Sequence, residues 1–138
     1  MPIDLHDSGY RVVSPYPALM PAVTAIFVPT MGGGDYRTDE AVVDSGSEYT
    51  WVPTRVPDEH GWDPIGVEPV AVWPLGGPEV NAPGFLTTVR IAQGEWPMPV
   101  FQLPSTSSLQ CVLVGQGLLR KLFVQMDGPR RHLLLQVP

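Results

Sequence analysis

Cysteine is almost absent from this sequence: Cys111 is the only one in 138 residues, so no disulfide can form within the chain. Its apolar surroundings, Cys-Val-Leu-Val, favour a buried and unreactive thiol. Charged residues are also scarce, at 16%, and the net charge is -6. Nucleic-acid binding needs a basic face, so that class of function is excluded.

Long apolar runs are missing as well. No run approaches the roughly 18 residues of a membrane-spanning helix, so no membrane partner is expected. No basic and apolar leader opens the sequence, so no signal peptide is expected and a cytoplasmic location is the default expectation.

Proline and glycine are abundant, with 17 and 14 copies, and they favour short strands joined by tight turns over long helices. The apolar fraction of 43% is ordinary for a folded protein, and the length suits one domain with a single core. Residues 1–20 are mixed and interrupted by prolines, which indicates an N-terminal arm. Residues 21–138 are predicted to form the domain.

The apolar pattern predicts many short strands and little helix. The predicted strands cover residues 22–28, 41–43, 49–52, 67–73, 85–91, 96–103, 111–114, 123–126 and 132–137. The first two are expected to pair as a hairpin, and so are the last two. Pro97 and Pro99 suit a strand at the edge of a sheet. One helical turn fits residues 54–60 and one or two turns fit 118–122, so the fold class is all-β, a sandwich or a barrel.

The most informative segment is Asp44-Ser45-Gly46, which follows the apolar strand 41–43. Gly46 allows close approach of the backbone, and Ser45 offers a hydroxyl to a neighbouring backbone group. Taken alone, the tripeptide is also typical of an ordinary turn. The sequence contains a second copy, Asp7-Ser8-Gly9, that no apolar strand precedes, and we interpret that copy as chance.

A second element supports the first. In Val112-Leu-Val-Gly115, Val114 lies 70 residues after Asp44, and a short helical pattern and a terminal hairpin follow this segment. In order and spacing, residues 21–137 resemble the retroviral-type, or retropepsin-like, aspartic proteases and their bacterial relatives.

The resemblance implies a single-lobe closed β-barrel with one short helix near the C-terminus. It also implies a homodimeric endopeptidase that cleaves extended polypeptides without a cofactor or metal. One carboxylate cannot serve as both acid and base, so Asp44 of each subunit would hold a water across a twofold axis. Ser45 and Gly46 would complete the catalytic group, and a flap with its tip at 75–77 would cover it. The implied substrate-binding residues are Ser47, Glu48, Trp73, Leu75, Gly76, Gly77 and Val114.

The sequence departs from the retroviral pattern at Gln116, where those members usually carry an arginine that pairs with the acid at the position of Glu48. That ion pair cannot form as such. Ser47 also replaces a frequent alanine. One alternative is therefore a catalytically inactive peptide-binding or dimerisation module with the same fold. An unrelated β-barrel or sandwich binding protein is another.

Other residues indicate no second chemistry. The three histidines lack metal-ligand spacing. No serine lies in a nucleophile elbow. Asp39-Glu40 and Asp58-Glu59 are interpreted as solvated surface charges.

Overall fold

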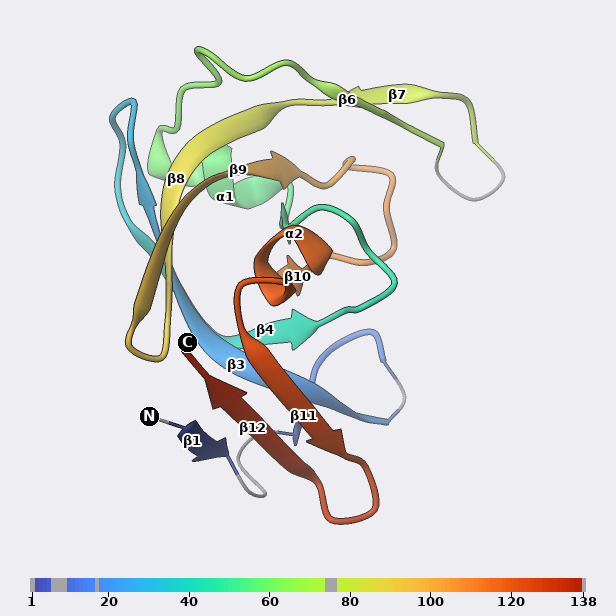
Figure 1. Ribbon diagram of the computed structural model, residues 1–138. Coiled ribbons are helices and arrows are strands. Elements are labelled where there is room, and N and C mark those ends of the chain that lie inside the picture. The colour runs from blue at the N-terminus through green and yellow to red at the C-terminus, as the bar shows by residue number, and fades with distance from the viewer. Residues whose placement is uncertain (1, 6–9, 17, 74–76, 138) are drawn as a thin grey trace.

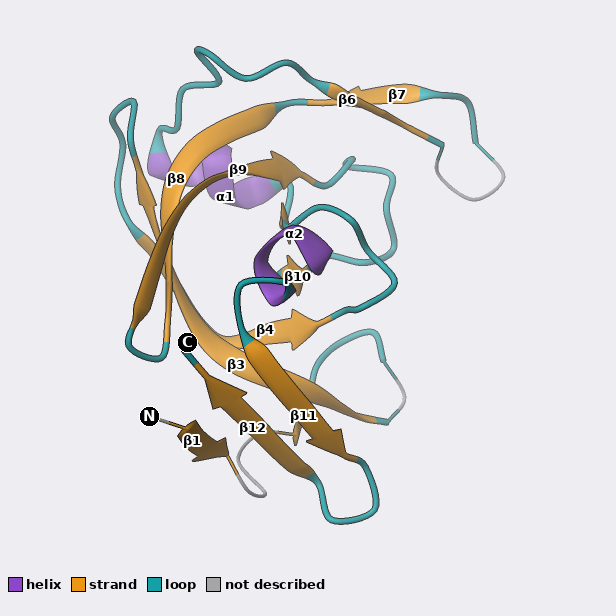
Figure 2. Ribbon diagram, in the orientation of Figure 1, coloured by secondary structure: helices purple, strands orange, loops and turns teal. Residues whose placement is uncertain are grey.

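The computed structural model describes residues 2–5, 10–16, 18–73 and 77–137, and strands dominate it (Figures 1 and 2). The strands are β1 (Pro2–Leu5), β2 (Tyr10–Val12), β3 (Leu19–Pro29), β4 (Tyr36–Val43), β5 (Trp51–Val52), β6 (Val70–Val72), β7 (Val80–Ala82), β8 (Gly84–Ile91), β9 (Gly94–Gln102), β10 (Leu113–Val114), β11 (Phe123–Asp127) and β12 (His132–Gln136). The helices are α1 (Arg55–His60) and α2 (Gln116–Leu119). The predicted all-β class is confirmed.

Six strands close into a ring. They are hydrogen-bonded in the order β3-β4-β10-β5-β9-β8, and β8 pairs back to β3. The β4–β10 and β5–β9 pairs are parallel, whereas the other pairs in the ring are antiparallel. Closure leaves no full-length edge among these strands, as the predicted closed architecture requires.

The main core fills this ring. Because side chains alternate between the two faces of a strand, every second residue of the long strands points inward. Phe27 of β3, Val89 of β8 and Val100 of β9 are all completely buried there. Leu118 of α2 and two leucines of β12 join the same cluster, so the C-terminal elements are packed against the ring.

The predicted hairpins are confirmed. The strands at 22–28 and 41–43 appear as β3 and β4, which pair with each other, and the terminal hairpin appears as β11 and β12. The helix expected near the C-terminus is α2, and the turn expected at 54–60 is α1, which ends at Gly61 in the left-handed conformation, with φ 67°.

The strand β7 is not predicted by the sequence pattern, because it has three residues and lies between Pro78 and Pro83. It pairs with β6, whereas β8 pairs with β9 and β3. The β6–β7 hairpin extends beyond the ring along the top of the view in Figure 1.

The expected N-terminal arm contains two strands. β1 pairs with β12 and forms a three-stranded sheet with β11 below the ring, while β2 pairs with β3 (Figure 1). Val13, which follows β2, is only 1% exposed, so this segment also contributes to a buried cluster. The boundary between arm and domain at residue 20 stays a prediction.

The strand β9 carries Pro97 and Pro99, as expected of an edge position. β8 pairs with β9 along its whole length, but β5 pairs with it only at Phe101 and Gln102. Within the described residues, the segment with the two prolines therefore has a neighbour on one side only, which agrees with the prediction. None of the helices formed by the described residues is long and apolar enough to cross a membrane.

Candidate active site

The two sequence motifs lie side by side. β4 and β10 are parallel neighbours, with Val42 opposite Leu113 and Val43 opposite Val114. The ladder continues past β4, because the Asp44 N–H donates to the Val114 carbonyl at 3.0 Å. Segments 70 residues apart thus meet at the point where the aspartate leaves its strand.

The turn itself holds the Asp44 carboxylate. The Gly46 N–H donates to Asp44 Oδ1 at 3.0 Å, and the Ser47 N–H donates to the Asp44 carbonyl at 3.2 Å. A Cβ on Gly46 would lie 3.3 Å from the same carboxylate oxygen, a tight contact. Asp44 is half-buried while Ser45 and Gly46 are exposed, so the carboxylate is fixed from its own chain yet open to solvent on one side.

The start of α2 docks against the loop that follows Asp44. The Gln116 N–H donates to the Ser47 carbonyl at 2.7 Å, and the Gly117 N–H donates to the Glu48 carbonyl at 3.1 Å. These carbonyls satisfy N–H groups that a helix end leaves unpaired. Each of the two motifs therefore holds the other in place.

A buried threonine ties the same two segments together. Thr50 is 1% exposed, and its hydroxyl accepts a hydrogen bond from the Gly115 N–H at 3.2 Å. This hydroxyl supplies the partner that the buried N–H needs.

Glu48, which cannot form an ion pair with Gln116, forms one with Arg120 instead. The Gln116 side-chain amide donates to the Ser45 carbonyl at 2.7 Å. Glu48 instead receives two hydrogen bonds from the guanidinium of Arg120, at 3.1 and 3.0 Å. Sequence reasoning missed Arg120. The signal was its position four residues after Gln116, which places it on the same face of a helix.

The side chain of Ser47, predicted to bind substrate, is engaged within the loop. Its hydroxyl donates to the Tyr49 carbonyl at 2.7 Å and accepts from the Trp51 indole N–H at 3.1 Å. Tyr49 and Trp51 both stack edge-on or tilted against Phe101, with ring centroids 4.9 and 5.9 Å apart. An aromatic group thus lies directly after the turn that contains Asp44.

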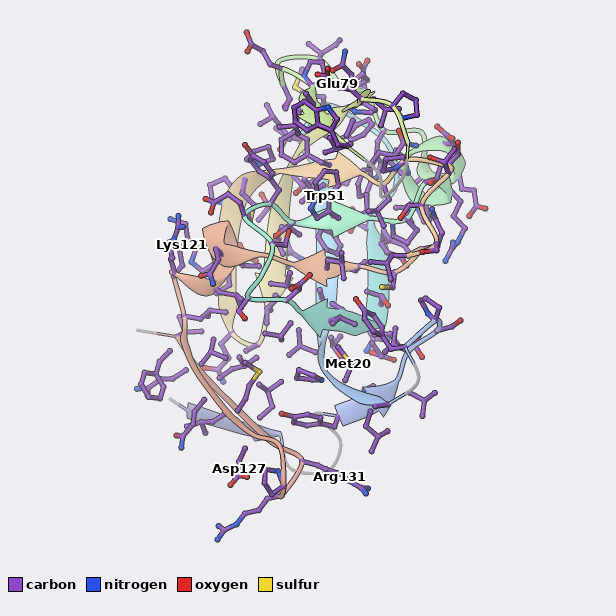
Figure 3. The ribbon with its side chains drawn as sticks, turned by 90° about the vertical axis from the view of Figure 1, so that its right-hand side faces the viewer. Met20, Trp51, Glu79, Lys121, Asp127 and Arg131 are labelled. Carbon is purple, nitrogen blue, oxygen red and sulfur yellow. The ribbon has the colours of Figure 1, made fainter. Side chains whose placement is uncertain are left out.

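A second buried cluster lies on the face of β4 and β10 that carries Asp44. It contains Val13, Ala22, Val42, Cys111 and Leu113, with Tyr16, Met20, Trp51 and Leu109 packed against it. Val114, predicted to bind substrate, belongs instead to the main core and contributes its carbonyl to Asp44. Figure 3 looks onto this side of the molecule, with Trp51 above the two strands and Met20 below them.

The predicted buried thiol is confirmed, since Cys111 is 7% exposed in this cluster. Burial raises the pKa of the Cys111 thiol, and the carboxylates of Asp44 and Glu40 raise it further. The thiol therefore stays protonated at neutral pH.

Trp73 lies at the end of the β6–β7 hairpin nearest the site. With Val72, Trp51, Leu103, Pro104 and Ser107 it lines a pocket of about 140 Å³. The Trp73 side chain is 70% exposed, and Gly77 is exposed. Leu75 and Gly76, predicted for the flap tip, lie outside the described residues.

The remaining sequence candidates do not converge on this site. Asp39 accepts from the Thr24 hydroxyl at 2.9 Å and Glu59 pairs with Arg55, both at exposed positions. Among the residues that the structure describes, no group of three or more His, Cys, Asp or Glu could hold a metal ion. His6 and the Asp7-Ser8-Gly9 copy lie outside the described residues.

No family model and no curated protein matches this sequence. Solved structures do match. A retropepsin-like aspartic protease from Rickettsia conorii covers 82% of this chain and 90% of its own, with a TM-score of 0.57 and 16% identity. EIAV protease in complex with the inhibitor HBY-793 gives a TM-score of 0.48 with 14% identity, over 79% of this chain and 92% of its own. The retroviral protease-like domain of Ddi1 from Leishmania major gives 0.43 with 15% identity, over 78% and 82%.

The likeness extends over most of both chains in the first of these comparisons, and its low identity makes it a statement about fold. In this chain the fold consists of a ring of strands, two motifs that pair in parallel, and a short helix after the second motif. The chain has the retropepsin-like fold of the aspartic proteases.

Proposed function

We propose that this chain is one subunit of a homodimeric aspartic endopeptidase, with Asp44 as its catalytic carboxylate. The observation that carries the proposal is the position of Asp44. It lies where the two motif strands meet, with its carboxylate fixed by Gly46 and open to solvent on one side. The retropepsin-like fold agrees with this assignment.

The second subunit follows from the chemistry. Hydrolysis of an amide needs one group that takes a proton from water and another that donates one to the substrate. Two carboxyls in contact share a single proton, because both cannot be ionised at such short range. The described part of one chain contains one Asp-Ser-Gly segment, so Asp44 of a second copy would complete the pair across a twofold axis.

The neighbouring residues receive roles within this scheme. One Asp44, ionised, would take a proton from the bound water, while the other, which carries the shared proton, would donate it to the substrate. Gly46 orients the carboxylate through its N–H, and Ser45, exposed on the same loop, would brace the two loops across the axis. Glu48 and Ser47 would form the floor beside the substrate.

The β6–β7 hairpin would act as the flap. It extends beyond the ring, and Trp73 at its end shares a pocket with Trp51, which follows the Asp44 loop. An extended peptide held between hairpin and loop would pair with strand edges through its main chain and place alternate side chains in pockets. Closure of the hairpin would exclude water from the reaction.

The test replaces Asp44 by asparagine, which keeps the shape of the side chain and removes the shared proton. Cleavage of an unstructured polypeptide at mildly acidic pH should fall by about a thousandfold or more. The dimer should persist, because the change relieves repulsion between like charges. Asp7→Asn, in the other Asp-Ser-Gly copy, is the matched control and should cleave at the normal rate. Full activity in Asp44→Asn would refute the assignment.

An inactive peptide-binding module is the second candidate, and Gln116 in place of arginine favours it. Wild-type protein that binds a statine-type peptide mimic but hydrolyses no substrate would support that function. Sedimentation that shows only monomer at tens of micromolar would contradict both the shared site and the dimerisation module.

A further inference from the structure

A cavity of about 310 Å³ lies between β7 and the segment that follows β9, at the root of the β6–β7 hairpin. In Figure 1 this segment runs below β7. The lining includes Asn81, Gln102, Ser105 and Thr106, and none of the described residues that line the cavity is charged. Three of these four, all except Gln102, are exposed, so the cavity is open to solvent. None of the described residues of the Asp44 turn lines it, so the proposed catalysis gives it no role.

The cavity lies where the ladder between β8 and β9 ends. In the last rung, the Gln102 N–H donates to the Pro83 carbonyl at 3.0 Å. Pro83 has no N–H, so it returns no hydrogen bond to the Gln102 carbonyl. By the register of the two strands, the next rung would join Asn81 to Pro104. Pro104 has no N–H either, and its carbonyl already accepts from the Ser107 N–H at 2.9 Å. The two prolines therefore stop the ladder, and the chains separate.

The backbone of Asn81 points into this opening. Along an extended strand, the N–H and carbonyl groups of successive residues point to alternate edges. The Pro83 carbonyl points towards β9, whereas the Leu86 carbonyl points to the other edge, where it accepts from the Thr30 N–H at 2.9 Å. Asn81 precedes Pro83 by two residues, so its N–H and carbonyl point to the same edge as the Pro83 carbonyl. In the part of the chain that the structure describes, no strand lies beside β7 at this edge, so both groups lack a backbone partner.

The open groups match the main chain of an extended polypeptide. The N–H and carbonyl of Asn81 can bond one residue of an added strand, as in a rung of an antiparallel sheet. The Gln102 carbonyl is a further acceptor. The hydroxyls of Ser105 and Thr106 and the amide of Asn81 add neutral hydrogen-bonding groups. Uncharged side chains fit this lining better than charged ones, because nothing in it would offset the desolvation of a charge.

We propose that this opening is an exosite, a second binding site that holds an extended, uncharged segment of the polypeptide substrate outside the catalytic cleft. The choice of occupant rests on the proposed function. The cavity shares Leu103 and Pro104 with the pocket lined by Trp51 and Trp73, so the two sites are neighbours. One substrate chain can therefore occupy both, and the exosite would strengthen the binding of long substrates over short ones.

The variant that tests the exosite is Asn81→Pro, which removes the N–H that points into the opening. The hairpin should persist, because the alternation of edges assigns the bonds with β6 to Val80 and Ala82. Ser108→Ala is the control. Ser108 is exposed on the segment that follows β9 and lines none of the cavities described above.

The kinetic measurement compares an unstructured polypeptide with a capped octapeptide that contains only its cleavage site. Asn81→Pro should raise KM for the polypeptide, relative to KM for the octapeptide, by about fivefold, the effect of one lost backbone hydrogen bond. Ser108→Ala should leave this ratio unchanged. An unchanged ratio in Asn81→Pro, with wild-type cleavage intact, would overturn the exosite and leave the peptidase standing.

A binding measurement separates the two proposals, because it needs no hydrolysis. The probe is a capped decapeptide of alternating threonine and glutamine, added to isotope-labelled Asp44→Asn protein and followed by amide NMR. The signals of Asn81, Ser105 and Thr106 should shift, and a probe that is N-methylated at every residue should not shift them. Such shifts without hydrolysis by the wild-type protein would support the exosite and contradict catalysis. No shift of these signals, or equal shifts with both probes, would overturn the exosite.

Discussion

Gly115→Ala should disrupt the junction between the two motifs. A Cβ on Gly115 would lie 2.1 Å from the Tyr49 carbonyl oxygen and 2.8 Å from that of Ser47, distances that real Cβ atoms essentially never show. The backbone of Gly115, with φ -95° and ψ -177°, is extended and open to any residue. The requirement for glycine at this position is therefore one of space.

The magnitude follows from what must move. The obstructing atoms belong to the backbone, and the Ser47 carbonyl already accepts a short hydrogen bond from Gln116 N–H. Overpacking costs about 1–3 kcal/mol and each strained hydrogen bond about 0.5–1.5 kcal/mol, so we expect a loss of about 3–5 kcal/mol in the free energy of unfolding. That is a large part of the roughly 5–15 kcal/mol that stabilises a typical domain.

Gly117→Ala is the matched control, two residues further on. Its Cβ would lie 3.5 Å from the Glu48 carbonyl oxygen, which is ordinary contact. Because Gly117 is inside α2, alanine should be neutral or stabilise the protein by up to about 1 kcal/mol. Urea unfolding, monitored by tryptophan fluorescence at one fixed subunit concentration, measures the free energy of unfolding of both variants. Gly115→Ala within about 0.5 kcal/mol of wild type would refute the reasoning.

Three further outcomes are expected. Thr50→Val should cost about 1–3 kcal/mol in urea unfolding, because it leaves the buried Gly115 N–H without its acceptor, whereas Thr50→Ser should cost less. A double-mutant cycle on Glu48 and Arg120 should give a coupling energy below about 1 kcal/mol, and added salt should reduce it, because both side chains are more than half exposed. A larger coupling energy would contradict the view that solvent screens this ion pair. Burial raises the pKa of the Cys111 thiol, so its contribution to stability is present below the ordinary value of 9.0 and is lost as pH rises through the raised one. Above pH 9.0 the free energy of unfolding should fall less steeply with pH in Cys111→Ala than in the wild type. If it falls as steeply in both proteins, the thiol is not the cause.

The sequence predicts the strands because their pattern is local. Residues 22–28 and 41–43 are apolar or β-branched and are bounded by turn residues, and they form β3 and β4 as expected. The short β7 is set by its pairing with β6, and three residues between prolines carry too little pattern to show it.

The candidate site is predictable in part for the same reason. Asp44 stands out because a strand delivers it into a turn with a glycine, and in the structure the Gly46 N–H donates to its carboxylate. The hydrogen bonds from Arg120 to Glu48 and the packing of Tyr16 against the cluster that contains Val42 depend on how distant segments pack. Such contacts have no signature in a single sequence, because any exposed arginine or tyrosine has the same local pattern.

The two prolines of β9 protect an open strand edge against pairing with other chains. An open strand edge has unpaired backbone N–H and carbonyl groups, and these can pair with a strand of another copy of the protein. The half of β9 that has only β8 beside it carries Pro97 and Pro99, which have no N–H to offer an incoming strand. Pairing of a further strand with this side of the ring is therefore disfavoured.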